Sequence, residues 1–147
     1  MTLPNLVSHR FVPQKGLRIL VQVPEVRAQD VIDAVLGVTA LKYGDYDRVT
    51  FTSAAGTQRF RSLGSGRNKA TETAVGVPCT EVSFFLSDDD AQATQVLEAI
   101  YAVHPYEEPV IFVETCLRTC HIRGLDEDNP NRFWNSKTQD WVPDSHR

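Results

Sequence analysis

The side chains best suited to chemistry in this sequence lie in the segment His104–Pro109, which reads His-Pro-Tyr-Glu-Glu-Pro. An imidazole and the carboxylates of Glu107 and Glu108 stand within four positions of one another, so they could converge on one metal ion or act as acid and base. A structural interpretation is also available, because the two prolines would end a helix and fix the start of the next strand, while His104 would meet the negative helix end. We favour the structural interpretation and keep these three residues as candidates for a single metal ion.

A second candidate is the basic stretch between Gln58 and Ala70. These 13 residues contain no acidic residue, include Phe60 as a stacking surface and hold four cationic side chains, which are Arg59, Arg61, Arg67 and Lys69. Such a stretch could bind a phosphate or another small anion. It is not a P-loop, because no Lys-Ser or Lys-Thr pair follows a glycine at the required interval. The alternative is a solvated hairpin that binds nothing.

The remaining candidates are weaker. Tyr43 and Tyr46 bracket a Gly-Asp turn and could belong to the core or line a cleft between subunits. Cys116, Cys120 and His121 are metal-ligand types, but a structural zinc site needs four ligands and the tight Cys-x-x-Cys pair is missing, so reduced and packed thiols are expected. No Gly-x-Ser-x-Gly or other nucleophile arrangement occurs, so the sequence gives no support to a hydrolase triad.

Composition narrows the class of protein. The chain has 147 residues, a hydrophobic fraction of 41% and a net charge of −4, which fit one soluble domain and do not favour nucleic acid as a partner. The longest apolar run is five residues, far below the ~20 that span a bilayer. The first ten residues lack the apolar run of a secretory signal, and three cysteines do not make a disulfide framework. We therefore expect a cytoplasmic protein without a membrane segment.

The elements that must position these residues follow a repeated pattern. A buried strand over 17–23 precedes an amphipathic helix over 28–36, and a buried strand over 82–86 precedes a helix over 93–101. The five apolar positions of the second helix lie 65 residues after those of the first. Ser87 is predicted to cap the second helix through the backbone N–H of Asp90.

Each strand and helix is followed by another strand, over 48–53 and 110–116. Two βαβ units of this kind predict an α+β fold, the ferredoxin-like split βαβ sandwich, with an antiparallel sheet and two helices on one face. An all-parallel doubly wound fold is the alternative, but two helices would leave one face of its sheet uncovered. A short extra hairpin strand is expected around Phe60.

We divide the chain into an N-terminal extension over 1–16, a ferredoxin-like domain over 17–117 and a C-terminal extension over 118–147. The last segment has little periodicity but keeps three large aromatic residues, Phe133, Trp134 and Trp141. It is expected to pack on the domain or on a neighbouring subunit.

Four motifs in order carry a resemblance to a known family. They are Gly44–Asp47 (Gly-Asp-Tyr-Asp), Phe51–Thr52, Gly56–Arg61 (Gly-Thr-Gln-Arg-Phe-Arg) and His104–Pro109. Together they resemble the inserted middle domain of the YqfO/Nif-three-like family, which is similar to the copper-tolerance protein CutA and to PII-type signalling proteins. The resemblance covers about residues 17–117 and implies a ferredoxin-like fold that assembles into trimers or higher oligomers.

The departures from that family bear on function. Full-length members are similar to metallohydrolases and bind two metals through a paired-histidine motif and a His-x-x-x-Glu motif, but this sequence has four separate histidines, none adjacent to another. We therefore expect no dinuclear centre and no hydrolase activity. The family's Asn-Pro after the basic loop is also missing, because Asn68 precedes Lys69.

These observations favour a non-catalytic, oligomeric, small-ligand- or metal-binding regulatory module without a resident cofactor. Its expected partners are other copies of itself, with a trimer favoured by the resemblance, and a small anionic ligand. The alternatives are a metal-tolerance protein of the CutA kind and an enzyme with an interfacial site around His104 and Glu107. The residues expected at a ligand site are Tyr46, Arg59, Arg61, His104, Tyr106 and Glu107.

Overall fold

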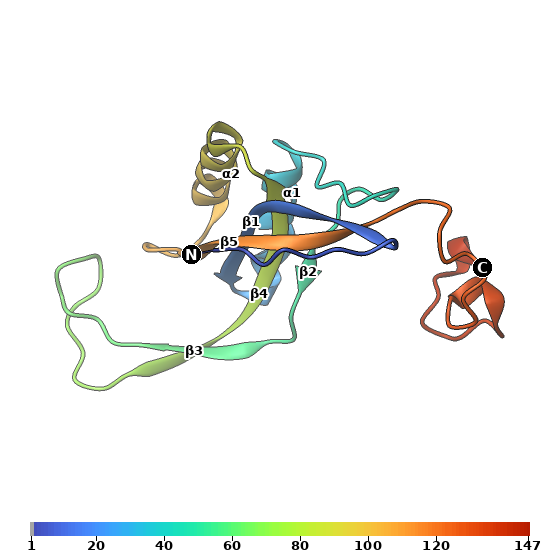
Figure 1. The fold of residues 1–147 in the computed structure, drawn as a ribbon. Coiled ribbons are helices and arrows are strands. Elements are labelled where there is room, and N and C mark those ends of the chain that lie inside the picture. Colours follow the sequence, from blue (N-terminus) through green and yellow to red (C-terminus); the bar gives the residue numbers. More distant parts are fainter. Residues whose placement is uncertain (1) are drawn as a thin grey trace.

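The computed structural model describes residues 2–147 and contains one antiparallel sheet with two helices packed on it (Figure 1). The order of strands across the sheet is β2-β4-β1-β5, and β3 pairs with β4 outside this order. The strands are β1 (Phe11–Val23), β2 (Phe51–Thr52), β3 (Gly56–Phe60), β4 (Val75–Ser87) and β5 (Val110–His121). The predicted ferredoxin-like fold is confirmed, with the first strand of each half, β1 and β4, in the centre of the sheet.

The core lies between the sheet and the helices α1 (Ala28–Leu36) and α2 (Asp90–Val103). Alternate residues of β1 and β4 point into it, because successive side chains of a strand face opposite sides of the sheet. The buried apolar side chains of the two central strands are Ile19, Val21, Val23, Val82, Phe84 and Leu86, and those of the helices include Val31, Val35, Val96 and Ile100. The helix residues buried here occupy positions of the apolar i, i+3, i+4, i+7 pattern from which the two helices were predicted.

Two local predictions were wrong. Asp89, not Ser87, is the N-cap of α2, and its carboxylate accepts a hydrogen bond from the backbone N–H of Gln92 at 3.1 Å. The expected strand over 48–53 is only the two residues of β2. Arg48 has a left-handed backbone with φ of 56°, and the N–H groups of Arg48 and Val49 donate to the carbonyls of Ala40 and Leu41 rather than to the sheet.

The strands β1 and β5 extend beyond the expected limits of the central domain. Their pairing runs from Phe11 opposite His121 to Gln22 opposite Val110. The pairing of β1 with β4 begins at Gly16, so residues 11–15 have a neighbour on one side only. Pro13, which has no N–H to donate, lies in this edge portion, where a strand tolerates proline.

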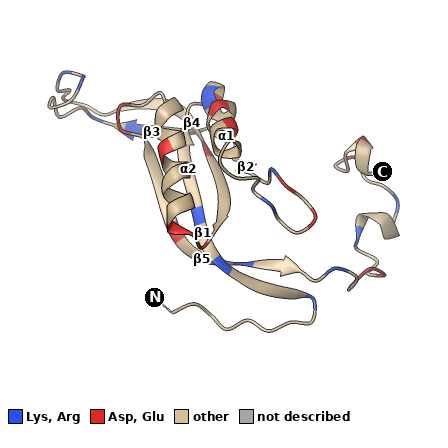
Figure 2. Cartoon of the chain, turned by 90° about the horizontal axis from the view of Figure 1, so that it is seen from above, with Lys and Arg blue, Asp and Glu red and all other residues tan. Residues whose placement is uncertain are grey.

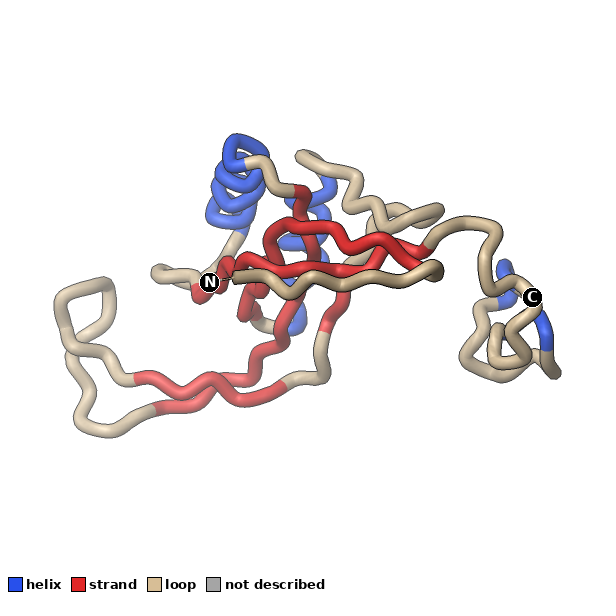
Figure 3. Tube along the Cα trace, in the orientation of Figure 1, coloured by secondary structure: helices blue, strands red, loops and turns tan. Residues whose placement is uncertain are grey.

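The strand β3 and the first part of β4 form an arm that projects from the sheet (Figures 1 and 3). Gly56–Phe60 pairs with Val75–Cys79, and a loop over 61–74 closes the end. Arg and Lys residues occur in this loop, at the end of the arm away from the helices (Figure 2). The basic stretch is therefore a hairpin, as expected.

The segment 122–147 lies at the opposite end of the molecule from the arm (Figure 1). It holds the short 3-10 turns η2 (Phe133–Asn135) and η3 (Asp144–His146). The aromatic ring of Phe133 packs edge-on against both tryptophans, and Arg10 contacts Asp126 at 3.4 Å.

In the described part of the chain, no helix has both the length and the apolar character needed to cross a bilayer. A further short turn, η1 (Glu25–Arg27), precedes α1.

Candidate functional site

His104 is an internal residue that joins the end of α2 to the sheet. Its side chain is 8% exposed, and its Nε2 lies 2.8 Å from the backbone carbonyl oxygen of Gln22 in β1. The backbone N–H of Tyr106 donates to Nδ1 at 3.1 Å. Because that donor requires an unprotonated Nδ1, the ring is the neutral tautomer with its proton on Nε2. Both ring nitrogens are used inside the chain.

The surroundings of His104 oppose its protonation. Burial lowers the pKa of His104 below its ordinary value of 6.5, and the nearby positive charge of Arg27 lowers the pKa further. The hydrogen bond to Gln22 acts in the opposite direction and does not offset the burial. A neutral ring with both nitrogens engaged fits the structural interpretation of this segment.

Glu107 binds the loop at the end of the arm. Its two carboxylate oxygens accept the backbone N–H of Arg67 at 3.0 and 2.9 Å. The carboxylate also lies close to Gly66, since a Cβ there would be 2.2 Å from Oε1 of Glu107 and the side chain would have to shift. A carboxylate accepting backbone N–H groups is a charge-assisted contact, so Glu107 holds the tip of the arm against the His104–Pro109 turn.

A groove runs between this turn and the arm. It has a volume of about 670 Å³ and is lined by Gln58, Phe60, Asn68 and the segment Pro105–Val110. The Tyr106 hydroxyl oxygen is buried and has no hydrogen-bond partner among the described residues. Burial and the proximity of Cys79 raise the pKa of Tyr106. The groove thus combines an aromatic wall with polar groups.

The other predicted site residues do not reach this groove. Arg59 lines a separate hollow of about 410 Å³ at the base of the arm, beside Gln22, Gln58, Cys79 and Glu81. Arg61 donates to the backbone carbonyl of Glu72 within the tip loop, at 3.3 Å. Tyr46 lies at the other end of the molecule, where its ring stacks on His146 with centroids 6.4 Å apart. Of the six predicted residues, only Tyr106 and Glu107 line the same groove.

The candidate metal ligands do not converge. No group of three or more His, Cys, Asp or Glu side chains is placed to hold a metal ion in the described part of the chain. The three cysteines carry free thiols, and burial raises the pKa of Cys79 and of Cys116. Cys116 and Cys120 lie opposite Gly16 and Val12 along β1 and β5, so they are separated by four residues of extended strand.

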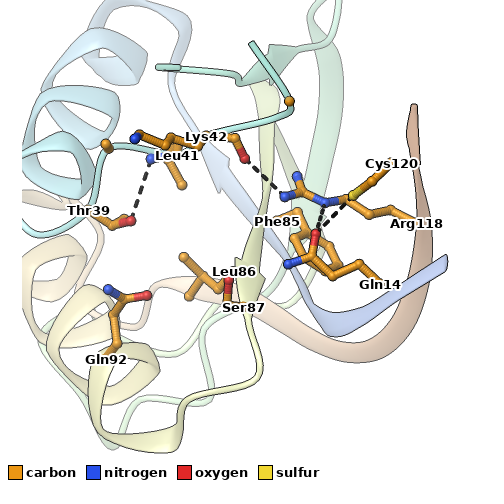
Figure 4. A pocket seen from close by; sticks show the side chains of 12 residues that line it. Gln14, Thr39, Leu41, Lys42, Phe85, Leu86, Ser87, Gln92, Arg118 and Cys120 are labelled. Carbon is orange, nitrogen blue, oxygen red and sulfur yellow. Dashed lines mark hydrogen bonds between the residues drawn. The ribbon is translucent and has the colours of Figure 1, made fainter. Parts of the chain in front are cut away.

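A pocket that the sequence did not predict lies at the C-terminal end of β4 (Figure 4). It has a volume of about 390 Å³, and Arg118 of β5 lies at its edge with its guanidinium between the rings of Tyr43 and Phe85, 4.2 and 4.0 Å from their centroids. Arg118 donates to the side-chain oxygen of Gln14 and to the backbone carbonyl of Lys42, both at 2.9 Å. The sequence around Arg118 does not indicate this pocket, because the hydrogen-bond partners of Arg118 lie 76 and 104 residues away in sequence.

Comparison with known proteins establishes the fold. No family model and no curated protein sequence matches the chain. A solved structure of a Bacillus cereus protein related to NIF3 superposes with a TM-score of 0.60 and 22% identity over 76% of this chain. This chain spans 28% of the length of that protein. CutA from Synechococcus elongatus PCC7942 superposes with a TM-score of 0.53 and 19% identity, covering 75% of this chain and 86% of CutA.

These two structures are similar to this chain in architecture. Both have the ferredoxin-like arrangement that the two strand-helix units predicted. At identities of 22% and 19% the likeness concerns the fold alone, and a fold hosts many functions.

Proposed function

We propose that this chain is a non-catalytic, self-assembling regulatory module of the YqfO/CutA-like type, which binds a small ligand and acts in the cytoplasm. The observation that carries the proposal is an apolar row across the sheet face opposite the helices. The row consists of Phe51, Leu20 and Phe112, with Ser83 between the first two. We call it the open-face row.

The register of the strands defines the open-face row. Leu20 pairs with Phe112 on one side and Ser83 on the other, and Ser83 pairs with Phe51. All four side chains therefore point to the same face. That face is the one opposite the core, because Ile19 and Val21 on either side of Leu20 are fully buried. The side chains of Phe51 and Phe112 are 67% and 51% exposed.

We propose that a second copy of the chain binds this open face of the sheet. The next row toward the C-terminal end of β4 places Arg18 opposite Glu114, so the apolar side chains are bordered by both signs of charge. A surface of this composition can be complementary to itself, and a self-complementary surface is what a symmetric homo-oligomer requires. The edge strands β2 and β5 also have free backbone N–H and C=O groups that could form hydrogen bonds with another chain. A trimer is the size that the sequence resemblance implies.

The groove between the arm and the His104–Pro109 turn supports the ligand-binding part of the proposal. Its volume of about 670 Å³ lies within the range of small-molecule sites, and its walls combine Phe60 and Tyr106 with Glu107 and Asn68. We place the ligand there, with further residues supplied by a neighbouring copy. Arg59 and Arg61, which the sequence suggested as anion ligands, do not line this groove in their own chain. In this proposal they contact the ligand only when a neighbouring copy supplies them.

The two alternative functions receive no support from the contacts of His104. A metal-binding function of the CutA kind, or an interfacial enzyme, would use His104 with Glu107 or Glu108. Here both ring nitrogens of His104 are bonded within the chain and the Glu107 carboxylate accepts the Arg67 N–H. Elemental analysis of untagged protein tests the metal alternative directly, since stoichiometric metal that is lost in His104→Ala would support it.

The assembly is tested by measuring the mass of the full chain by light scattering after size-exclusion chromatography. We expect a multiple of 16.5 kDa at micromolar concentration. Phe112→Glu and Phe51→Glu should shift the mass to that of one chain. Val26→Glu is the matched control, because Val26 is 89% exposed and lies in the turn η1, outside the sheet. A wild-type mass of one chain, or an equal effect of Val26→Glu, would contradict the proposal.

A further inference from the structure

We propose that the pocket at the C-terminal end of β4 binds a small organic anion, whose carboxylate or phosphate group is held by the guanidinium of Arg118. This site shares no lining residue with the open-face row or with the groove beside the arm. It borders the row, because Phe85 lies two residues after Ser83 on the same face of β4, while Gln14 at its other side lies six residues before Leu20, about 20 Å along β1. All the residues that line the pocket belong to one chain.

The residues that line the pocket carry positive charge, which favours an anionic ligand. The lining side chains include two cations, Lys42 and Arg118, and no aspartate or glutamate. Neither cation forms an ion pair with any carboxylate among residues 2–147. In a chain with a net charge of −4, a concave surface with two unpaired cations is a distinct positive region.

The fixed position of Arg118 is the second argument. Its guanidinium lies between the aromatic rings of Tyr43 and Phe85, and Tyr43 is itself fixed by a hydrogen bond from its hydroxyl to the carbonyl of Thr119. Arg118 donates once from Nε and once from an Nη. A guanidinium has five N–H donors, so three are left without a partner in the described chain. An arginine held in one orientation loses little freedom when it binds a planar or tetrahedral oxyanion.

The remaining walls indicate an organic anion rather than a bare inorganic ion. Leu41, Leu86 and Phe85 contribute apolar surface, and Thr39, Ser87, Gln14 and Gln92 contribute hydroxyl and amide groups (Figure 4). A volume of about 390 Å³ is within the range of pockets that hold small metabolites. A compound with one oxyanion and hydroxyl substituents on a short carbon skeleton fits these groups.

Calorimetric titration of the full chain with three matched probes tests the proposal. Glycerate carries a carboxylate, glycerol 3-phosphate carries a phosphate and glycerol carries neither on the same three-carbon skeleton. We expect at least one charged probe to bind and glycerol not to bind. Binding of glycerate alone identifies a carboxylate ligand, binding of glycerol 3-phosphate alone identifies a phosphate ester, and binding of both shows that the site recognises the oxyanion.

Variants assign the binding to this pocket. Arg118→Lys keeps the charge but removes the planar set of donors, and it should weaken binding about tenfold, as expected for loss of charge-assisted hydrogen bonds. Lys42→Gln should also weaken binding, and it should fold normally because Lys42 is exposed. Lys69→Gln, in the tip loop of the arm, removes the same charge far from the pocket and should leave binding unchanged.

Nitrogen-15 NMR of the wild type gives a measurement that does not depend on the folding of a variant. The Nε–H resonance of Arg118 should shift on addition of the charged probe and not on addition of glycerol. The proposal is wrong if no charged probe binds at millimolar concentration, if glycerol binds equally well, or if Lys69→Gln alone abolishes binding, which would place the anion on the arm. Phe112→Glu should retain binding, so failure of the assembly proposal and failure of this one are distinguishable.

Discussion

Replacement of His104 tests whether the His104–Pro109 segment is structural. His104→Ala removes the hydrogen bonds from Nε2 to the Gln22 carbonyl and from the Tyr106 N–H to Nδ1, each worth about 0.5–1.5 kcal/mol net. It also removes the contact with the Tyr106 ring, whose centroid lies 4.8 Å away, a pair worth about 0.5–1.5 kcal/mol. The expected loss of unfolding free energy is therefore about 1.5–4.5 kcal/mol.

This expected loss is larger than the sequence alone suggests for a histidine at a helix end. An exposed histidine at a helix end would contribute only about 0.3–1 kcal/mol through the helix dipole. The burial of the ring makes it a larger contributor. His104→Asn is a useful second variant, because its amide oxygen can still accept the Tyr106 N–H. We expect it to lose about 1 kcal/mol less than His104→Ala. Glu108→Ala, at an exposed neighbour, should change stability by less than about 0.5 kcal/mol.

The pH dependence gives an independent check with a definite sign. The folded-state pKa of His104 is lowered by burial, so the unfolded chain binds a proton more readily than the folded chain below pH 6.5. The contribution of His104 is therefore fully present above pH 6.5 and decreases as the pH falls toward the folded-state pKa. Urea unfolding followed by circular dichroism should show a larger gap between wild type and His104→Asn at pH 7.5 than at pH 5.5. A gap that is constant or grows on acidification would refute this account of the ring.

Substitutions at three further positions have expected outcomes in unfolding or amide-exchange measurements. Tyr106→Phe should leave the unfolding free energy unchanged or raise it by about 1 kcal/mol, because the buried hydroxyl has no partner; a loss of that size would contradict the contacts described. Gly16→Ala should cost about 1–3 kcal/mol in urea unfolding, because its Cβ would lie 2.2 Å from a backbone carbonyl of β4; an unchanged midpoint would show that the strands separate easily. Glu107→Ala should speed amide exchange at Arg67 roughly five- to tenfold through loss of its acceptor, and Glu107→Gln should do so less; equal rates in all three proteins would show that the tip loop is held by other contacts.

The paired strand-helix units were predictable because burial itself produces their spacing. Val31 and Val35 are fully buried against β1 and β4, as are Val96 and Ile100. An apolar residue at each of these positions is what a helix on a sheet requires, so the period of the pattern identifies the element. The two central strands were identified by their apolar runs, in which Ile19 and Val21 of β1 face the core while Leu20 between them lies on the open face.

The ends of elements depend on backbone geometry that the residue types do not specify. Ser87, Asp88, Asp89 and Asp90 are all able to cap a helix, and the extended backbone of Asp89 is what makes it the cap. The strand over 48–53 shortened because Arg48 adopts a left-handed conformation that favours glycine or asparagine, an outcome without a sequence signal. Both differences leave the order of elements unchanged.

The candidate site was predicted less well because its contacts join residues distant in sequence. His104 was a candidate because of its residue type, but its burial and its contact with a carbonyl 82 residues away are set by the fold. The basic stretch was a hairpin as expected, yet Arg59 and Arg61 do not share a pocket with Tyr46. Arg118 was not a candidate because its surroundings depend on two aromatic rings that the fold brings to it.

The contacts of Gln22 explain why the His104–Pro109 turn and the arm belong to one structural unit. The Gln22 backbone carbonyl lies 2.8 Å from Nε2 of His104, and its side-chain oxygen accepts a hydrogen bond from Gln58 of β3 at 3.0 Å. The Gln22 amide in turn donates to Glu81 of β4 at 3.1 Å. The turn is thus connected to the base of the arm through His104 and Gln22, and to its tip through Glu107 and the Arg67 N–H.

A hairpin that projects from a sheet has few buried contacts of its own, so its direction must be fixed by hydrogen bonds at more than one point along its length. The turn supplies both points, one at the base and one at the tip. This explains why an imidazole and a carboxylate occur three positions apart in a segment whose side chains do not converge on one atom. His104 reaches the Gln22 carbonyl of β1, whose side chain bonds the base of the arm, and Glu107 accepts the Arg67 N–H at the tip. The groove between turn and arm has a defined shape because both ends of the arm are held.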